Sequence, residues 1–156
     1  MTPAINTARK ANINFELLEY THDSSAASYG LEAAEKLGLD PAQVFKTLVV
    51  ELDGKTLAVA MVPVTHQLGL KQVAKAAGAK KAAMASPAAV ERATGYVLGG
   101  VSPLGQKKRL ASFIDDSARG FATLYVSAGR RGLEIALAPE ALATLCQARF
   151  APLTAP

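Results

Sequence analysis

Lys46 is the first residue whose position suggests chemistry, because it lies in the apolar run of residues 45–52. If this run is a β-strand, its side chains alternate between two faces. The other members of the face of Lys46 are apolar: Leu48, Val50 and Leu52. An ammonium group there is costly unless it is paired or reaches a cleft. Two interpretations stay open: Lys46 extends into a site, or its aliphatic stem carries the charge from the strand end to water.

A glycine-rich segment at residues 99–105, Gly-Gly-Val-Ser-Pro-Leu-Gly, is a second candidate. Glycines let a ligand approach the backbone closely, and their N–H groups can bind an oxygen of a carbonyl or phosphate. The segment is not a P-loop, because no Gly-Lys-Ser/Thr follows, and its glycine spacing does not match a dinucleotide fingerprint. By itself it is equally consistent with a plain turn.

Charged residues at three further places can be interpreted in two ways. The basic turn at residues 129–132, Gly-Arg-Arg-Gly, can contact a phosphate or be a solvated hairpin loop. The run at residues 107–109, Lys-Lys-Arg, is more typical of a solvated surface. Glu134 lies in the apolar run 133–137, on the face opposite to its apolar neighbours. Its carboxylate therefore faces either solvent or a cleft.

Several familiar kinds of site are excluded. Cys146 is the single cysteine, so no internal disulfide forms, and its apolar neighbours on a helix favour a small buried side chain over a nucleophile. The two histidines, His22 and His66, lack the spacing of a metal pair, and we expect no metal or cofactor. No Gly-x-Ser-x-Gly motif is present. Any catalysis must work without an obvious protein nucleophile.

Local signals place these residues on a series of short elements. Helices are predicted where a Ser or Thr N-cap or a proline in the first turn begins a segment and a C-terminal glycine ends it. Asp53-Gly54 predicts a tight hairpin turn. The expected helices are 3–11, 28–37, 69–77, 86–93 and one beginning at Pro139. The expected strands are 14–20, 45–52, 55–62, 96–98, 110–115, 121–127 and 133–137. This irregular mixture predicts an α/β fold with a mixed, mostly antiparallel sheet flanked by helices.

Composition sets the broad class of the protein. The 156 residues are 50% apolar and 19% charged, which excludes intrinsic disorder and fits a single compact domain over residues 1–156. No apolar run approaches the length of a membrane span, and no secretory signal pattern opens the sequence, so we expect a cytoplasmic protein with no membrane partner. Residues 1–70 have five Lys/Arg and eight Asp/Glu, a net charge of −3. Residues 71–156 have twelve and five, a net charge of +7, which points weakly to a polyanion.

Three blocks occur in an order that resembles one family: Val44-Phe45-Lys46-Thr47-Leu48-Val49, Gly99-Gly100-Val101-Ser102-Pro103, and Gly129-Arg130-Arg131-Gly132-Leu133-Glu134-Ile135. The chain is similar over nearly its whole length to the YbaK-type Cys-tRNA(Pro) deacylases, relatives of the editing domain inserted in bacterial prolyl-tRNA synthetase. The resemblance implies the fold of that family, which we expect to contain a barrel-like sheet.

The resemblance also implies a site. Lys46 corresponds to the essential lysine of the family, and the backbone of Gly99, Gly100 and Val101 would hold the aminoacyl group and the terminal adenosine. The other residues expected in the same pocket are Tyr20, Tyr29, Thr47, Ser102, Pro103, Ser127 and Glu134. Tyr29 is often Phe in relatives, and Glu134 stands where family members have Asp.

The implied chemistry explains the missing nucleophile. The thiol of the substrate's own cysteine attacks its ester carbonyl, which releases the tRNA and forms a cysteine thiolactone. The protein then mainly positions the reacting atoms and stabilises the oxyanion. The implied partners are mischarged tRNA, which can lie along the basic half of the chain, and, transiently, prolyl-tRNA synthetase.

Three alternatives remain. One is a hydrolytic deacylase for another mischarged tRNA such as Ala-tRNA(Pro), and another is a non-catalytic tRNA-binding module of the same fold. The third is a pocket protein for a small metabolite. The low aromatic content, 6%, argues against a base-stacking platform.

Overall fold

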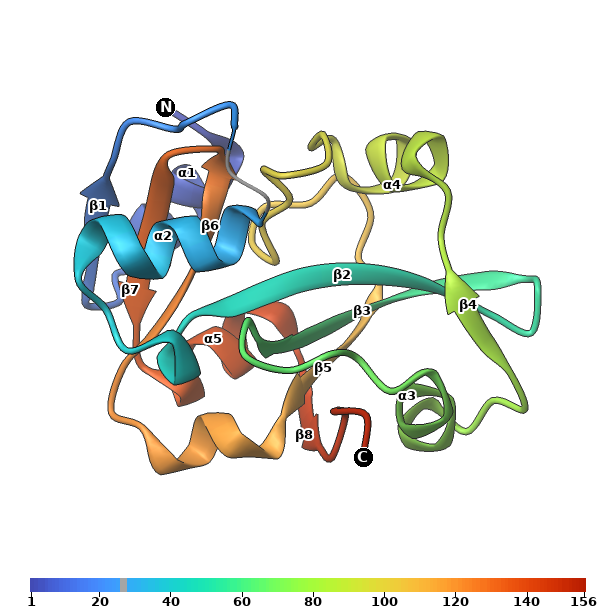
Figure 1. Cartoon of the computed structure of the whole chain (residues 1–156). Helices are drawn as coiled ribbons and strands as arrows, with labels where there is room; N and C mark the ends of the chain where they lie inside the picture. Colours follow the sequence, from blue (N-terminus) through green and yellow to red (C-terminus); the bar gives the residue numbers. More distant parts are fainter. Residues whose placement is uncertain (26–27) are drawn as a thin grey trace.

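Two separate β-sheets organise the computed structural model, which describes residues 1–25 and 28–156 (Figure 1). The smaller sheet is antiparallel, in the order β1-β7-β6. Its strands are β1 (Phe15–Glu19), β6 (Leu124–Arg130) and β7 (Leu133–Leu137). The larger sheet has the order β4-β2-β3-β5-β8. Its strands are β2 (Phe45–Leu52), β3 (Thr56–Pro63), β4 (Ala82–Met84), β5 (Ala111–Asp115) and β8 (Arg149–Ala151).

The pairing confirms the expected mixed, mostly antiparallel arrangement. In the larger sheet β2 pairs antiparallel with β3 and β4, whereas β3–β5 and β5–β8 are parallel. An isolated bridge from Val44, just before β2, to Tyr125 of β6 joins the two sheets at one corner. Neither sheet closes on itself, so the expectation of a barrel-like sheet is wrong: a single bridge replaces the continuous ladder that closure requires.

The described residues form five α-helices, and their ends follow the local signals. They are α1 (Pro3–Lys10), α2 (Tyr29–Leu37), α3 (Leu70–Ala77), α4 (Pro87–Thr94) and α5 (Pro139–Cys146), with short 3₁₀ turns at Pro41–Gln43 and Asp116–Gly120. The hydroxyls of Thr2, Ser28 and Ser86 accept hydrogen bonds from backbone N–H groups in the first turns of α1, α2 and α4. Figure 1 shows α1 and α2 beside the smaller sheet, and α4 and α3 on opposite sides of the far end of β2.

The β2–β3 hairpin turns as predicted, because both of its central residues have positive φ: 53° at Asp53 and 66° at Gly54. The register that follows pairs Lys46 with Val62. Alternation along β2 then gives its two faces different cores. Val50 joins the cluster around Val73 of α3, whereas Phe45 joins the larger cluster between the sheets.

The larger core fills the space between the two sheets, α1 and α5. Its central members are Ile5, Met61, Ile114, Val126, Ile135 and Leu142. The smaller core lies under α3 and contains Val50, Ala60, Val62, Val73 and Phe113. Apolar packing on both faces holds β2 and β3 rigidly, which fixes the position of the side chains at the beginning of β2.

One expected strand is absent and two short strands were missed. Residues 96–98 form no strand in the structure: Tyr96 is buried and its hydroxyl donates to the carbonyl of Leu104 at 2.6 Å, while Val97 and Leu98 are exposed. The segment is therefore part of a loop that is held by a hydrogen bond between two of its own residues. The three-residue strands β4 and β8 are too short to show a period of two.

No helix of the described ranges has both the length and the apolar character needed to cross a membrane.

Candidate active site

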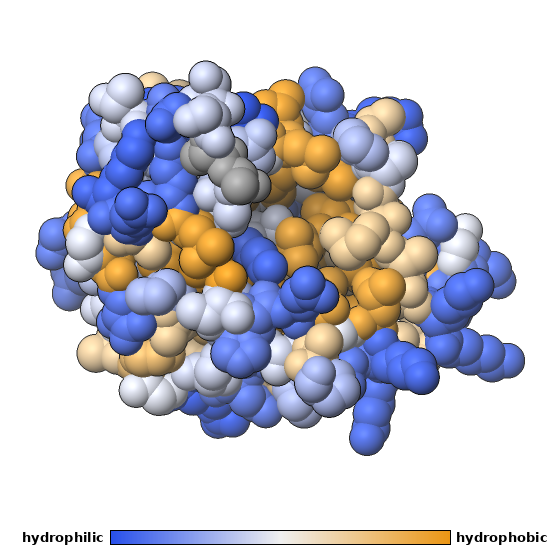
Figure 2. Space-filling view, in the orientation of Figure 1, coloured by the Kyte–Doolittle hydropathy of each residue, from blue (hydrophilic) through white to orange (hydrophobic). Residues whose placement is uncertain are grey.

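A cavity of about 370 Å³ opens where five parts of the chain meet: the end of β1, the beginning of β2, the beginning of α2, the loop after α4, and the β6–β7 hairpin. Figure 2 shows this face, with a hollow near the centre of the view that is bordered by apolar surface above and to its right. The lining residues are Tyr20, Ser28, Tyr29, Gly30, Val44, Phe45, Lys46, Thr47, Leu48, Leu98, Gly99, Val101, Ser127, Arg130, Arg131 and Glu134.

Eight of the eleven residues expected in the site line this cavity. They are Tyr20, Tyr29, Lys46, Thr47, Gly99, Val101, Ser127 and Glu134. The remaining three, Gly100, Ser102 and Pro103, do not line it. The hydroxyl of Ser102 is buried and accepts from the N–H of Leu104 at 3.2 Å, and the carbonyl of Pro103 accepts from the thiol of Cys146. These contacts shape the loop.

The backbone of Gly100 is also engaged within the loop. Its N–H donates to the carbonyl of Val97 at 3.0 Å. A Cβ at this position would lie 2.9 Å from Cα of Arg130, so glycine lets the loop pass close to the β6–β7 hairpin. Gly100 thus serves the close approach of two backbones, and its N–H can reach a substrate only if the bond to Val97 breaks.

Lys46 lies at the edge of the apolar face of β2, as its alternation predicts. Leu48, Val50 and Leu52 follow it on that face and belong to or pack against the core under α3. Its side chain is half-buried in the cavity wall, and this burial lowers the pKa of its ammonium group. Among the described residues no carboxylate oxygen lies within 4.0 Å of Nζ. Lys46 is therefore a positive charge available to a ligand.

Glu134 faces the cavity and not bulk solvent. It lies in the middle strand of the smaller sheet, between Leu18 of β1 and Ser127 of β6, and only 7% of its surface is exposed. Burial raises the pKa of its carboxyl from 4.5 to about 8. The pKa of Tyr20, also in the cavity wall, is raised by burial and further by the charge of Glu134.

Thr47 contributes a polar atom without a partner. Its Oγ1 is buried and has no hydrogen-bond partner in the described part of the chain. Leaving such a group unpaired costs about 1–3 kcal/mol. Thr47 lines the cavity beside Lys46, and its buried hydroxyl lies beneath the surface of that wall.

Arg131 ties three parts of the cavity mouth together. Its guanidinium lies over the ring of Tyr29, with Cζ 4.0 Å from the ring centroid, and donates to the carbonyl of Leu98 at 3.2 Å. Gly99 has a φ of 88°, and a Cβ there would lie 2.3 Å from Nε of Arg131. The arrangement therefore requires glycine at position 99. The basic turn at residues 129–132 is the sequence feature that indicates a role for Arg131, and both of its arginines lie in the cavity wall.

A buried carboxylate in α2 binds residues 22 and 23, in the loop after β1. Glu32 is 6% exposed and lies 2.7 Å from Nδ1 of His22 and 3.3 Å from Nζ of Lys36. The backbone N–H of Asp23 donates to its second oxygen at 2.7 Å. The ring of His22 is 5.5 Å from that of Tyr29, so the network supports one wall of the cavity. Neither a periodic pattern nor a motif in the sequence indicates this network.

Of the groups set aside as nucleophiles or metal ligands, Cys146 and His66 do not line the cavity, and His22 lies behind the wall formed by Tyr29. Cys146 is buried in α5, as its pattern predicts, and burial raises the pKa of its thiol to about 12. Neither a cysteine nor a histidine lines the cavity. Within residues 1–25 and 28–156, no three His, Cys, Asp or Glu side chains are grouped so as to hold a metal ion. The cavity wall offers three cationic side chains (Lys46, Arg130 and Arg131), a protonatable carboxyl and hydroxyls.

Comparison with known proteins adds to this geometry. The model of the aminoacyl-tRNA editing domain matches residues 24–145. A candidate Cys-tRNA(Pro)/Cys-tRNA(Cys) deacylase, EbsC of Enterococcus faecalis, is 41% identical over 78% of this chain and 74% of its own length. The uncharacterized protein YwhH of Bacillus subtilis is 29% identical over 71% of this chain and 70% of its own length.

The fold has close counterparts among solved structures. The crystal structure of a candidate trans-editing enzyme for prolyl-tRNA synthetase superposes with a TM-score of 0.84 at 22% identity, covering 100% of this chain and 99% of that chain. At this identity the superposition establishes the fold alone. The family match over most of the sequence and the 41% identity to EbsC establish more: this chain belongs to the aminoacyl-tRNA editing-domain family.

Proposed function

We propose that this protein is a trans-acting deacylase that removes cysteine from mischarged Cys-tRNA(Pro), and from Cys-tRNA(Cys). The observation that carries the proposal is the composition of the cavity wall. Among the residues that the structure describes, the wall combines Lys46, Arg130, Arg131 and Glu134 with hydroxyl groups and contains no cysteine or histidine. Such a wall suits a reaction whose nucleophile belongs to the substrate. Family membership and the name of EbsC support the same substrate.

In the proposed reaction the sulfur of the cysteinyl group attacks the carbonyl carbon of its own ester. A C–S bond forms, the C–O bond to the ribose breaks, and the thiol proton passes to the ribose oxygen. The products are a cysteine thiolactone and uncharged tRNA. Because attacking and attacked groups belong to one molecule, the protein contributes mainly by holding a reactive conformation.

Lys46 would stabilise the negative charge that develops on the carbonyl oxygen. Its ammonium has no carboxylate within 4.0 Å among the described residues, and its half-buried position makes its charge more effective than in water. The N–H groups of Gly99 and Val101, on the loop facing β2, are the further candidates for this role. The N–H of Gly100 is already bonded to Val97.

Glu134 would bind the α-ammonium group of the aminoacyl moiety. Without a bound ligand, burial favours the protonated carboxyl, because it raises the pKa of Glu134 to about 8. An ammonium ion beside it favours the carboxylate and restores a paired charge. The hydroxyl of Tyr20 lies in the same wall and can orient the substrate.

Selectivity would follow from chemistry more than from shape. A methylene more or less in an apolar pocket changes binding by only about 1–3 kcal/mol. Proline lacks a thiol, so a correctly charged Pro-tRNA(Pro) that entered the cavity would have no nucleophile. We also propose that the protein acts in the cytoplasm, in transient association with prolyl-tRNA synthetase.

The test is deacylation of Cys-tRNA(Pro), Ser-tRNA(Pro) and Ala-tRNA(Pro) by the purified protein in excess EDTA. The proposal expects rapid loss of cysteine only. Similar rates for alanine or serine would replace it with a hydrolytic editor. Binding of all three without deacylation would replace it with a non-catalytic tRNA-binding module.

A further inference from the structure

A second cavity lies on the loop that follows α4. It has a volume of about 340 Å³ and is lined by Thr7 of α1, residues 105–110 with Pro103, Ser112, Leu145 and Cys146. The beginning of the same loop, Leu98 to Val101, lines the candidate active site. One loop thus contributes its first part to the active site and its second part to this cavity.

The charge of the second cavity is of one sign. Lys107, Lys108 and Arg109 are consecutive, exposed lining residues, and no lining residue is acidic or aromatic. Within the described chain, none of the three has a carboxylate oxygen within 4.0 Å. Three adjacent cations repel one another, and an anion bound among them relieves that repulsion.

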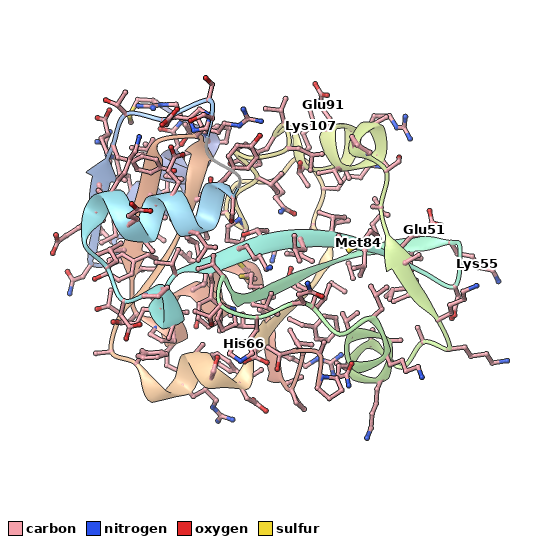
Figure 3. The ribbon with its side chains drawn as sticks, viewed as in Figure 1. Glu51, Lys55, His66, Met84, Glu91 and Lys107 are labelled. Carbon is pink, nitrogen blue, oxygen red and sulfur yellow. The ribbon has the colours of Figure 1, made fainter. Side chains whose placement is uncertain are left out.

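The backbone holds these cations in place. The N–H of Lys107 donates to the carbonyl of Thr94 at 3.1 Å, and that of Lys108 to the carbonyl of Ala93 at 3.0 Å. The stem of Lys107 packs over Gly95, where an added Cβ would be 3.3 Å from its Cγ. Figure 3 shows Lys107 beside α4. The charges are therefore presented by an anchored segment, which lowers the entropy cost of binding.

We propose that this second cavity binds backbone phosphates of the same RNA whose aminoacyl end occupies the active site. This inference rests on the proposed function. The absence of aromatic lining residues argues against base stacking, whereas lysine, arginine and neutral hydroxyls are the groups that contact phosphates. The cavity would then position the acceptor end and contribute affinity that does not depend on the aminoacyl group.

The spacing fits one continuous ligand. Lys107 is six positions after Val101 in the sequence, so their Cα atoms are at most about 22 Å apart. At a rise of about 3.4 Å per nucleotide along a stacked strand, this span corresponds to about six nucleotides at most. A tRNA acceptor end is long enough to reach both cavities.

A charge-neutralising variant tests the proposal against a matched control. The test variant is K107Q/K108Q/R109Q. The control, K71Q/K75Q/K80Q, removes the same charge from two positions in α3 and from Lys80, three residues after its end, all outside both cavities. Uncharged tRNA(Pro) is titrated with each protein between 50 and 200 mM salt. Deacylation is measured on full-length Cys-tRNA(Pro) and on a cysteinylated dinucleotide that lacks the stem phosphates.

The proposal expects the test variant to bind tRNA about tenfold more weakly or worse at 100 mM salt, with a log–log salt slope reduced by about two to three. The control should bind within about twofold of the wild type, and all three proteins should deacylate the dinucleotide equally. Equal weakening in both variants, or no weakening in either, overturns the proposal.

The two proposals fail separately. If the wild type deacylates neither substrate, the proposed function is wrong, but a selective loss of tRNA binding in the test variant still supports an RNA-phosphate cavity. If the wild type deacylates both substrates and the test variant matches the control, the function stands and the phosphate cavity is wrong. A free-anion site would instead show inhibition by inorganic phosphate without any change in tRNA affinity, which also contradicts the proposal.

Discussion

Replacing Glu134 with glutamine should make the protein more stable while reducing its activity. The carboxyl is buried in the cavity wall, and burial raises its pKa from 4.5 to about 8. In the unfolded chain the same group ionises near its ordinary pKa. Between these two values the folded state binds more protons than the unfolded state, so the stability of the wild type must fall as pH rises.

The size of this effect follows from the two pKa values. Each pH unit between them corresponds to about 1.4 kcal/mol, so ionisation of Glu134 in the unfolded chain lowers the wild-type stability by about 5 kcal/mol between pH 4.5 and 8, and by about 3 kcal/mol at pH 7. Glutamine has nearly the same shape and does not titrate. E134Q should therefore exceed the wild type by about 3 kcal/mol at pH 7 and by less than about 1 kcal/mol at pH 5.

Urea unfolding followed by circular dichroism at pH 5, 6, 7 and 8 measures this difference. Subtracting the unfolding free energy of the variant from that of the wild type cancels the contribution of histidine titration. The control is E16Q, which removes an exposed carboxylate of β1. A stability difference that does not grow from pH 5 to pH 8 would refute the burial argument. Because an amide binds an ammonium ion poorly, we also expect a raised KM for Cys-tRNA(Pro).

Three further substitutions test other parts of the site. K46A should lower kcat for Cys-tRNA(Pro) by about 10²–10³-fold with an unchanged circular dichroism spectrum, since it removes a charge aimed at the oxyanion; full activity would remove Lys46 from the site. T47V should raise stability by about 1 kcal/mol in urea unfolding, because it removes an unpaired buried hydroxyl, and should weaken deacylation; lower stability would mean that the hydroxyl is paired. C146A should retain deacylation within about threefold, whereas loss of turnover in a stable variant would show that the protein supplies a thiol.

The sequence predicts those elements whose ends have local chemical signals. The helices capped by Ser28 and Ser86 and the hairpin at Asp53-Gly54 appear where expected, because a cap or turn depends on only a few adjacent residues. The strand expected at residues 96–98 is wrong, since the hydroxyl of Tyr96 anchors that segment to Leu104 instead of a neighbouring strand. That partner is a matter of tertiary contact, which periodicity does not encode.

The site divides in the same way. The alternation of Lys46 and Glu134 along their strands leaves a cleft and solvent open for each side chain, and the structure brings both side chains to one cavity. The stacking of Arg131 on Tyr29 and the support of Glu32 by His22 join residues 102 and 10 positions apart in the chain, and nothing in their spacing predicts either contact. The separation of the two sheets likewise depends on how the strands pair, which the pattern of each strand leaves open.

The identity of the first product is the most direct test of the central claim that the substrate supplies the nucleophile. Wild-type protein is mixed with Cys-tRNA(Pro) or Ser-tRNA(Pro) in ¹⁸O-labelled water, and the released amino acid is analysed by mass spectrometry at early times. The account predicts unlabelled cysteine thiolactone as the first product and deacylation of the serine ester at least about 100-fold more slowly, because a hydroxyl is a much weaker nucleophile than a thiol. Free ¹⁸O-labelled cysteine as the first product, with serine released at a similar rate, would contradict it.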